Sequence, residues 1–526
     1  MVTGELTLNV LDGANTIGGT KILLHERDRG LLLDFGLNYN RFNRFFEEYL
    51  KPRKPAGLRD LWLLKIIPPY PELYRPDLRV DPLPNAGEIP AKEIDGVVLS
   101  HAHMDHAGLI GLLNLSIPII SSATTLAILR AYQDSGKTEF YQEVTYASPH
   151  ERKTRRTHCF IETVYWRSKP HQGRNAVVMN GELSKELKQL WQRQANPDGS
   201  GRKMMPGEIS TIQDASLDWR IESFPVDHSI PGACAVIVET ENGPIVYTGD
   251  LRKHGTRGDQ TDAFVQEASK RDPWVLIVEG TRVTKDDEKD TTDEEECKEN
   301  CFKAVEAAKD RLIVADFSPR HLERLVMFHE IAQETDRRLV VLPKDAYLLD
   351  SLQGVESRAP IPTDSLLIYD PLKVQEDKWE QWILDRYSDF LVAPCEIKSA
   401  QSEYLLAFSF FDIKHLIDIQ PRGGTYVYSS SEPYTEEQQI DFWRLFNWLS
   451  YFDFEVKGFR YNKDQLVLES GYHCSGHAPA DDLEKIILTI DPEILLPVHT
   501  EDPQWFKDKF ANSFQVILSA SLNYKK

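Results

Sequence analysis

Short apolar runs recur along the chain, and several of them end in histidine or carboxylate residues. Runs of this kind, bounded by turn residues, are typical of buried strands. In the first half of the chain they predict strands over 6–10, 21–25, 31–36, 97–99, 117–120, 219–224, 235–239, 244–247 and 275–278. Asn242-Gly243 separates two of these strands and predicts a tight hairpin turn. A further apolar stretch at 109–113 predicts one side of a helix.

The stretch 100–108 concentrates residues that bind metals, with three histidines and one aspartate within six positions. His101 and His103 are two positions apart and can point to the same side of the chain. Asp105 and His106 can serve a second centre close by. Imidazole and carboxylate together suit zinc or a similar divalent ion. We therefore predict a metal site at this strand-to-helix turn.

Two long segments, 37–90 and 133–210, show no clear periodicity, which is typical of insertions or lids. The first interleaves aromatic and arginine side chains, which could stack single-stranded bases or could simply pack locally. The second carries a basic run at 152–156 and, further on, Lys169, His171 and Arg174. These cations could follow a phosphate backbone, although a solvated charged face is the more common outcome for such a run.

The composition changes near residue 285, where an acidic stretch predicts a domain boundary. Thr292, with Glu295 three positions later, predicts a capping box at the start of the next helix. Beyond 297 the patterns alternate, with strands predicted at 312–315, 339–342, 390–393 and 425–428 and helices at 320–335 and 436–450. This alternation predicts an α/β domain with a parallel sheet.

The final segment, 455–526, again places site-type residues beside regular elements. The Ser-Gly-His stretch at 475–477 precedes a predicted helix, and a short strand at 493–498 ends in His499. Near the start of the chain, Asp34 lies at the end of a buried strand and could orient a ligand histidine. A lone aspartate at such a position is more often a turn residue.

The composition is that of an ordinary globular protein, with 41% hydrophobic and 27% charged residues. No apolar run is long enough to span a membrane, the first residues do not resemble a signal peptide, and the six cysteines include no C-x-x-C pair. A cytoplasmic location is expected. The formal net charge of −21 argues against a protein that coats nucleic acid. It does not exclude a nuclease, because a local basic groove or bound metals can reverse the field at a site.

In these motifs the chain resembles the metallo-β-lactamase superfamily, and within it the β-CASP nucleases similar to ribonuclease J. The motifs that carry the resemblance are, in order, Asp34, His101-x-His103-x-Asp105-His106, His228, Asp250, Glu279, Ser475-Gly476-His477 and His499. Glu279 is followed by Gly280-Thr281-Arg282, a variant of the family's usual acidic motif.

The resemblance implies an α/β fold, namely a metallo-β-lactamase αββα sandwich interrupted by an inserted β-CASP α/β domain with a parallel sheet. The sandwich would occupy 1–285 and 456–526, and the inserted domain 286–455. The two irregular segments are larger than the family core leads us to expect. Because the chain stops soon after His499, the extra C-terminal domain of ribonuclease J is not expected. A homo-oligomer remains open, but that family's assembly is in doubt.

The resemblance also implies two zinc ions, which manganese could replace, and hydrolysis of phosphodiester bonds by a hydroxide that the metals activate. The expected ligands of one ion are His101, His103 and His228. Those of the other are Asp105, His106 and His499, with Asp250 bridging both. His477, held by Glu279, is expected to act as a general acid or as a donor to the scissile phosphate.

His499 favours single-stranded RNA as the substrate, because histidine at this motif accompanies RNA-acting members of the family. The Ser475-Gly476-His477 form favours a 5′-to-3′ exonuclease that leaves 5′-phosphate products, with endonuclease action as the alternative. Weaker resemblances assign Ser318, Arg320 and Ser430, together with Ser475 and Gly476, to substrate binding. The remaining alternatives are a DNA nuclease, a metallo-hydrolase of small esters and a non-catalytic scaffold. No membrane partner is expected.

Overall fold

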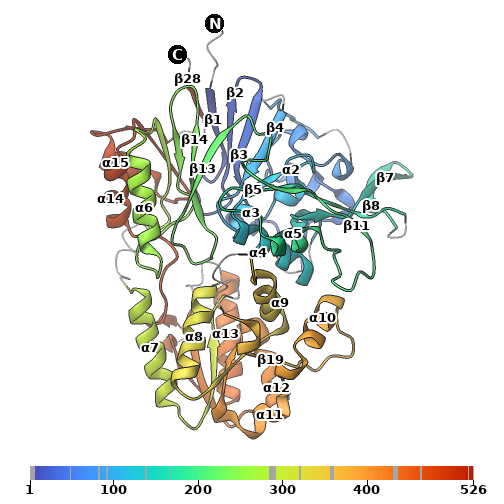
Figure 1. Cartoon of the computed structure of the whole chain (residues 1–526), viewed down its shortest axis with the longest axis vertical. Coiled ribbons are helices and arrows are strands. Elements are labelled where there is room, and N and C mark those ends of the chain that lie inside the picture. The colour runs from blue at the N-terminus through green and yellow to red at the C-terminus, as the bar shows by residue number, and fades with distance from the viewer. Residues whose placement is uncertain are drawn as a thin grey trace.

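The computed structural model of the chain describes residues 6–47, 49–80, 83–89, 93–136, 139–165, 168–283, 292–318, 321–355, 361–430, 436–462, 465–518 and 521–524. Figure 1 shows two lobes stacked along the long axis of the molecule. The upper lobe contains both ends of the described chain and two large sheets, and the lower lobe contains one large sheet. None of the described helices is long and apolar enough to cross a membrane.

The first sheet of the upper lobe has eight strands in the order β12-β10-β5-β4-β3-β2-β1-β28. The strands are β1 (Leu6–Asp12), β2 (Lys21–Glu26), β3 (Arg29–Phe35), β4 (Glu93–Val98), β5 (Ile119–Ser121), β10 (Ala176–Val178), β12 (Ile209–Thr211) and β28 (Ser521–Tyr524). The pairs from β28 to β3 are antiparallel, and those from β3 to β12 are parallel.

The second sheet has six strands in the order β13-β14-β15-β16-β26-β27. They are β13 (Arg220–Pro225), β14 (Cys234–Glu239), β15 (Ile245–Tyr247), β16 (Val275–Glu279), β26 (Ile494–Val498) and β27 (Gln515–Val516). β14 and β15 form the antiparallel hairpin expected from Asn242-Gly243. The two sheets face each other across one apolar core, in which Leu33 and Val98 of the first sheet pack with Val236 of the second.

Helices cover the outer face of each sheet (Figure 1). On the second sheet these are α6 (Gly258–Ser269), α14 (Ala480–Ile490) and α15 (Pro503–Phe510), which share a core with β14, β16 and β26. On the first sheet they are α2 (Arg59–Leu63), α3 (Met104–Ala107), α4 (Ala123–Ser135) and α5 (Lys185–Gln192). The layers therefore follow the order helix, sheet, sheet, helix, which confirms the predicted αββα sandwich.

The lower lobe is built on a seven-stranded sheet in which every pair is parallel, in the order β20-β19-β18-β21-β17-β22-β23. Its strands are β17 (Leu312–Asp316), β18 (Arg338–Val341), β19 (Leu367–Tyr369), β20 (Leu391–Val392), β21 (Tyr404–Ala407), β22 (Gly424–Tyr428) and β23 (Phe454–Lys457). Its helices are α7 (Glu294–Ala307), α8 (Leu322–Glu334), α9 (Pro343–Leu352), α10 (Lys378–Arg386), α11 (Pro394–Ser399), α12 (Leu416–Ile419) and α13 (Glu436–Tyr451). The parallel α/β insertion is confirmed. A hairpin of β24 (Phe459–Asn462) and β25 (Gln465–Leu468) packs against its core.

Two local predictions are wrong. The apolar stretch 109–113 does not form a regular helix: α3 ends at Ala107, and a short 3-10 helix, η4 (Ile110–Leu112), follows. Leu109 and Leu113 are fully buried, as is η4 between them, so the run is apolar because it is enclosed on all sides. The cap of α7 is Asp293 rather than Thr292, since the Asp293 side chain accepts the Glu296 N–H.

The segment 133–210 contains more regular structure than its sequence predicts. β10 and β12 extend the first sheet, and β6 (Tyr146–Ala147), β9 (His171–Gly173) and β11 (Met204–Met205) form a small sheet. β7 (His150–Arg155) and β8 (His158–Thr163) form an antiparallel hairpin that projects from the lobe (Figure 1). Strands of two or three residues are too short to show a period-two pattern, so the segment was expected to be irregular.

Arg174 is not the phosphate-binding residue that the sequence allowed, because its side chain is completely buried. Its guanidinium donates five hydrogen bonds of 2.8–3.0 Å to the backbone carbonyls of Ile110, Leu113, Asn114, Ile117 and Val144. Buried carbonyls need such partners, so Arg174 fastens the loop that follows the predicted metal-binding stretch to β10.

Replacing Arg174 with Met should destabilise the upper lobe by roughly 3 kcal/mol or more, because several buried carbonyls lose their donors. Urea unfolding followed by circular dichroism measures this loss. The matched control is Arg155→Met on the exposed hairpin, which should stay within about 0.5 kcal/mol of the parent. Equal stability of the two variants would contradict the anchoring role of Arg174.

Candidate metal centre

The predicted ligands lie in loops that leave one edge of the two sheets. The stretch 101–106 follows β4, His228 follows β13, Asp250 follows β15, and His499 follows β26. β15, β16 and β26 are parallel neighbours, as are β3 and β4, so their carboxyl ends meet at the edge that faces the lower lobe. The fold thereby brings together side chains that are far apart in the sequence. His499 Nε2 lies 3.2 Å from Asp105 Oδ2, although the two residues are 394 positions apart.

His101, His103 and His228 form the first group of candidate ligands. His103 Nδ1 lies 3.0 Å from His101 Nε2 and 3.1 Å from His228 Nε2. Nitrogen ligands held about 2.0–2.1 Å from one tetrahedral zinc ion are about 3.3 Å apart, which is close to this spacing. Burial and the neighbouring imidazoles lower the pKa of His101 well below its usual value, and burial lowers that of His228 to about 4. Neutral rings keep the lone pairs that a metal needs.

Asp105, His106, Asp250 and His499 form the second group. Asp105 Oδ2 lies 3.2 Å from His499 Nε2 and 3.9 Å from His106 Nε2. Burial alone would raise the pKa of Asp105, but the imidazoles of His106 and His499 lower it overall, so the carboxylate is ionised. The group therefore combines imidazole nitrogens with ionised carboxylate oxygens, the donor types that divalent metal sites use.

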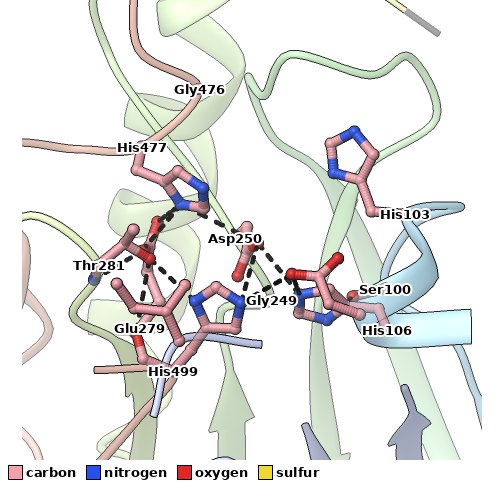
Figure 2. A network of polar contacts seen from close by, with 12 residues as sticks. Ser100, His103, His106, Gly249, Asp250, Glu279, Thr281, Gly476, His477 and His499 are labelled. Atoms are coloured by element: carbon pink, nitrogen blue, oxygen red, sulfur yellow. Dashed lines mark hydrogen bonds and ion pairs between the residues drawn. The ribbon is translucent and has the colours of Figure 1, made fainter. Parts of the chain in front are cut away.

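Asp250 lies between the two groups. Its Oδ2 is 3.1 Å from His106 Nε2 and 3.8 Å from His499 Nε2 in the second group, and 3.7 Å from His101 Nε2 in the first. Figure 2 shows it in the middle, with His106 on one side and the pair of His477 and Glu279 on the other.

Two buried polar atoms at the centre of the site test whether a cation fits. Asp250 Oδ1 is shielded from solvent and makes no hydrogen bond among the described residues, and His106 Nε2, equally shielded, has the Asp250 Oδ2 atom 3.1 Å away. Buried polar atoms are nearly always paired, and both of these are good metal ligands. The geometry therefore fits divalent metal ions, and the set of nitrogen and oxygen donors suits either zinc or manganese.

Asp34 fixes the ring of His106. Its Oδ2 accepts a hydrogen bond from His106 Nδ1 at 2.7 Å, and the same carboxylate accepts from the Ser100 N–H and hydroxyl, both at 2.8 Å, and from the Tyr247 hydroxyl at 2.5 Å. This contact leaves His106 Nε2 facing Asp250. Such outer hydrogen bonds orient ligands and raise their basicity.

Two further ligand rings, those of His228 and His499, are held in a similar way. His228 Nδ1 donates to the Gly476 carbonyl at 2.7 Å, and His499 Nδ1 lies 2.9 Å from the Thr281 hydroxyl. Gly476 is predicted to bind substrate, and in the structure its carbonyl holds a candidate metal ligand. Thr281 and Tyr247 were missed, because a hydroxyl that contacts a distant residue leaves no local pattern in the sequence.

The backbone around the site is tightly constrained. Asp34 and His499 adopt φ values of 55° and 52°, which are uncommon for residues other than glycine and concentrate at functional sites. A Cβ on Gly36 would lie 1.6 Å from the Asp105 carbonyl oxygen, and one on Gly18 would lie 2.9 Å from Asp105 Cβ. These glycines let the chain approach Asp105 closely. The contact between Gly18 and Asp105 leaves no local pattern in the sequence.

The partly exposed His477 pairs with the fully buried Glu279 beside Asp250. His477 Nδ1 lies 3.1 and 3.0 Å from the two carboxylate oxygens of Glu279 and 3.9 Å from Asp250 Oδ2. Burial lowers the pKa of His477, but the two carboxylates raise it more, to about 9. Glu279 also accepts the N–H groups of Leu251 and Thr281. The ring is thus held by one nitrogen, with the other free for chemistry.

The remaining substrate-binding predictions fall into three classes. The Ser475 hydroxyl accepts the His477 N–H at 3.2 Å, so it shapes the loop that carries His477. Ser318 and Ser430 follow the carboxyl ends of β17 and β22, which are adjacent parallel strands of the lower lobe. Arg320 lies outside the described residues.

Arg252 joins the site to the lower lobe and was not anticipated. This fully buried side chain pairs with Asp227 at 3.1 Å, with Glu294 of α7 at 2.9 Å and with Glu323 of α8 at 2.8 Å. It also donates to the Ser475 carbonyl at 3.0 Å. One side chain therefore connects the Asp250 loop, the His477 loop and the first two helices of the insertion.

Known proteins share parts of this arrangement. The family model for the metallo-beta-lactamase superfamily matches residues 68–121, which include the stretch 101–106. Ribonuclease J of Pyrococcus abyssi is 24% identical over 452 residues, 82% of this chain and 80% of that protein. Ribonuclease J 2 of Streptococcus pyogenes is 24% identical over 334 residues, 62% of this chain and 55% of that protein.

A solved structure shows the same fold over the whole chain. The crystal structure of a protein of unknown function from Enterococcus faecalis V583 superposes with a TM-score of 0.65. It is 20% identical and covers 99% of this chain and 100% of its own.

Asp34→Asn should lower the affinity for one of two bound metal ions by about 10–100-fold, because His106 loses the carboxylate that orients its ring. Competition with a chromophoric zinc chelator measures both affinities. Tyr247→Phe is the matched control, since it removes one hydrogen bond from Asp34 and leaves the contact with His106. Unchanged affinity for both ions in folded Asp34→Asn protein would show that Asp34 does not support a metal ligand.

Proposed function

We propose that this ribonuclease J-like protein of the metallo-β-lactamase superfamily is a metal-dependent ribonuclease. It hydrolyses phosphodiester bonds of single-stranded RNA, as a 5′-to-3′ exonuclease that leaves 5′-phosphate products. The observation that carries the proposal is the Glu279–His477 pair, 3.0 Å apart and bordering Asp250. Hydrolysis of a small ester does not need this second acid–base pair, whereas a phosphodiester has an alkoxide leaving group that benefits from a proton donor. The ribonuclease J relatives support RNA as the substrate.

The two groups of ligands would hold two zinc ions, with manganese as the alternative. His101, His103 and His228 would hold one, Asp105, His106 and His499 the other, and Asp250 would bridge them. When bound, two such metals supply an activated water and neutralise charge on the phosphate. The imidazole and carboxylate donors that gather in both groups support this assignment.

His477 would provide the proton for the leaving oxygen. Its Nδ1 faces Glu279, so Nε2 is the atom left to meet the substrate. A pKa of about 9 keeps the ring protonated at neutral pH, and cations bound at Asp250 would bring that pKa down towards neutrality, where proton transfer is effective. Glu279 acts as a positioning residue, because it is fully buried and reaches the reaction only through His477.

The direct test is to incubate metal-loaded protein with 5′-end-labelled and 3′-end-labelled single-stranded RNA and DNA. We expect RNA to be degraded, with mononucleotides released from the 5′ end. Degradation of DNA alone would overturn the choice of substrate. Internal fragments from both labels would show that the protein is an endonuclease rather than an exonuclease.

Two substitutions test the roles of the residues. Asp105→Ala should abolish cleavage together with binding of one metal equivalent. His477→Ala should lower kcat by about 10²–10⁴-fold and leave metal content unchanged, because it removes proton donation and no ligand. Near-normal cleavage by Asp105→Ala in a metal-clean preparation would refute the two-metal assignment. Near-normal kcat in His477→Ala would refute the role of the donor.

A further inference from the structure

The segment 39–59 begins beside the metal centre and continues along the protein surface. Its first helix, α1 (Tyr39–Phe42), is capped by Asn38, whose side chain accepts the Arg41 N–H. One residue earlier, the Leu37 N–H donates to the Met104 carbonyl at 2.9 Å, next to the candidate ligand Asp105. A polymer leaving the metal centre on this side would therefore meet α1 first.

Aromatic side chains concentrate on this segment. Tyr39 and Phe45 are each 44% exposed and Tyr49 is 87% exposed. With Leu50 and Leu63, five of the fourteen exposed large hydrophobic side chains in the described part of the chain fall between 39 and 63. Exposed aromatic rings next to arginines form the platform on which single-stranded bases stack.

The same segment continues to the projecting hairpin. β8 packs on the 3-10 helix η1 (Lys54–Ala56), and β7 packs on η3 (Pro76–Leu78). The base of the hairpin is fixed, since the His150 N–H donates to Asp77 at 3.0 Å. Its outer part, including Arg155 and Arg156, is exposed and carries no core. Figure 1 shows it reaching away from the upper lobe.

This surface is basic although the chain carries a net charge of −21. The segment 39–59 has six arginines and lysines against two glutamates, and the hairpin has four against two. Lys51, Arg53 and Lys153 have carboxylate partners. Within the described ranges, Arg44, Lys54, Arg155 and Arg156 have no carboxylate at ion-pair distance.

We propose that segment 39–59 and the β7–β8 hairpin together form a track that binds the RNA strand outside the metal centre. The aromatic rings stack bases close to the centre, and the hairpin arginines contact phosphates further away. This inference rests on the proposed function and adds a surface that the catalytic motifs do not include. Unpaired cations on an acidic protein are where a polyanion gains the most electrostatic free energy.

The test is a double charge reversal, Arg155→Glu with Arg156→Glu, in metal-loaded protein. The matched control is Lys303→Glu with Lys309→Glu on the far end of α7 and the loop after it, which changes the net charge equally. For a long single-stranded RNA we expect KM to rise about tenfold in the hairpin variant and to stay within about twofold in the control. The slope of log KM against log salt should fall by about 1.4, which corresponds to two lost phosphate contacts on a single strand.

Stacking has its own variant and readout. Tyr49→Ala should raise KM about fivefold or more, as removal of one base-stacking ring does, whereas Tyr451→Ala on the distant helix α13 should not change it. Both losses should shrink as the RNA is shortened, because a short oligonucleotide does not reach the track.

The outcomes separate the two proposals. If the parent protein degrades RNA and the hairpin variant behaves like its control at every RNA length, the track is refuted and the proposed function stands. If only Tyr49→Ala has no effect, the stacking half is refuted. If the parent protein neither binds nor cleaves RNA, the proposed function fails and the track fails with it.

Discussion

The candidate site is organised around the carboxylate group of Asp250. A single oxygen, Oδ2, lies within 3.9 Å of nitrogens from five histidines: His101, His106, His228, His477 and His499. Its other oxygen is buried and makes no hydrogen bond with any residue that the structure describes. Removing a carboxylate from water is costly unless positive charge compensates it. Metal ions in the two flanking groups of ligands would provide that compensation, so folding of these loops and binding of metal are expected to be coupled.

The position of the inserted lobe follows from the same arrangement. β16 ends in Glu279, after which the chain leaves for the lower lobe, and it returns to the site at His477. These two residues are 198 positions apart and 3.0 Å apart in space. Because β26 then pairs with β16 in parallel, the two ends of the insertion border the metal centre. Arg252 connects the two lobes at this junction through its ion pairs with Glu294 and Glu323. A movement of the lower lobe would therefore displace the loops that carry Asp250 and His477.

The layers implied by the family resemblance are confirmed, and the structure brings the expected ligands together, since strands that end in histidine or aspartate leave a local pattern in the sequence. The sequence could not predict contacts between distant loops, such as Gly36 against the Asp105 carbonyl or Thr281 against His499. It was wrong about 109–113, since a run enclosed on all sides has the same composition as the apolar side of a helix. It also misplaced the cap of α7 by one position, because Thr292 and Asp293 are both good caps and the apolar pattern does not separate them.

The central claim is that two metal ions share Asp250. Crystals of zinc-loaded protein, measured with X-rays at the zinc absorption edge, test it most directly. We expect two anomalous peaks, one among His101, His103 and His228 and one among Asp105, His106 and His499, each at ligand distance from Asp250. A single peak, or zinc bound elsewhere with both groups empty, would contradict it.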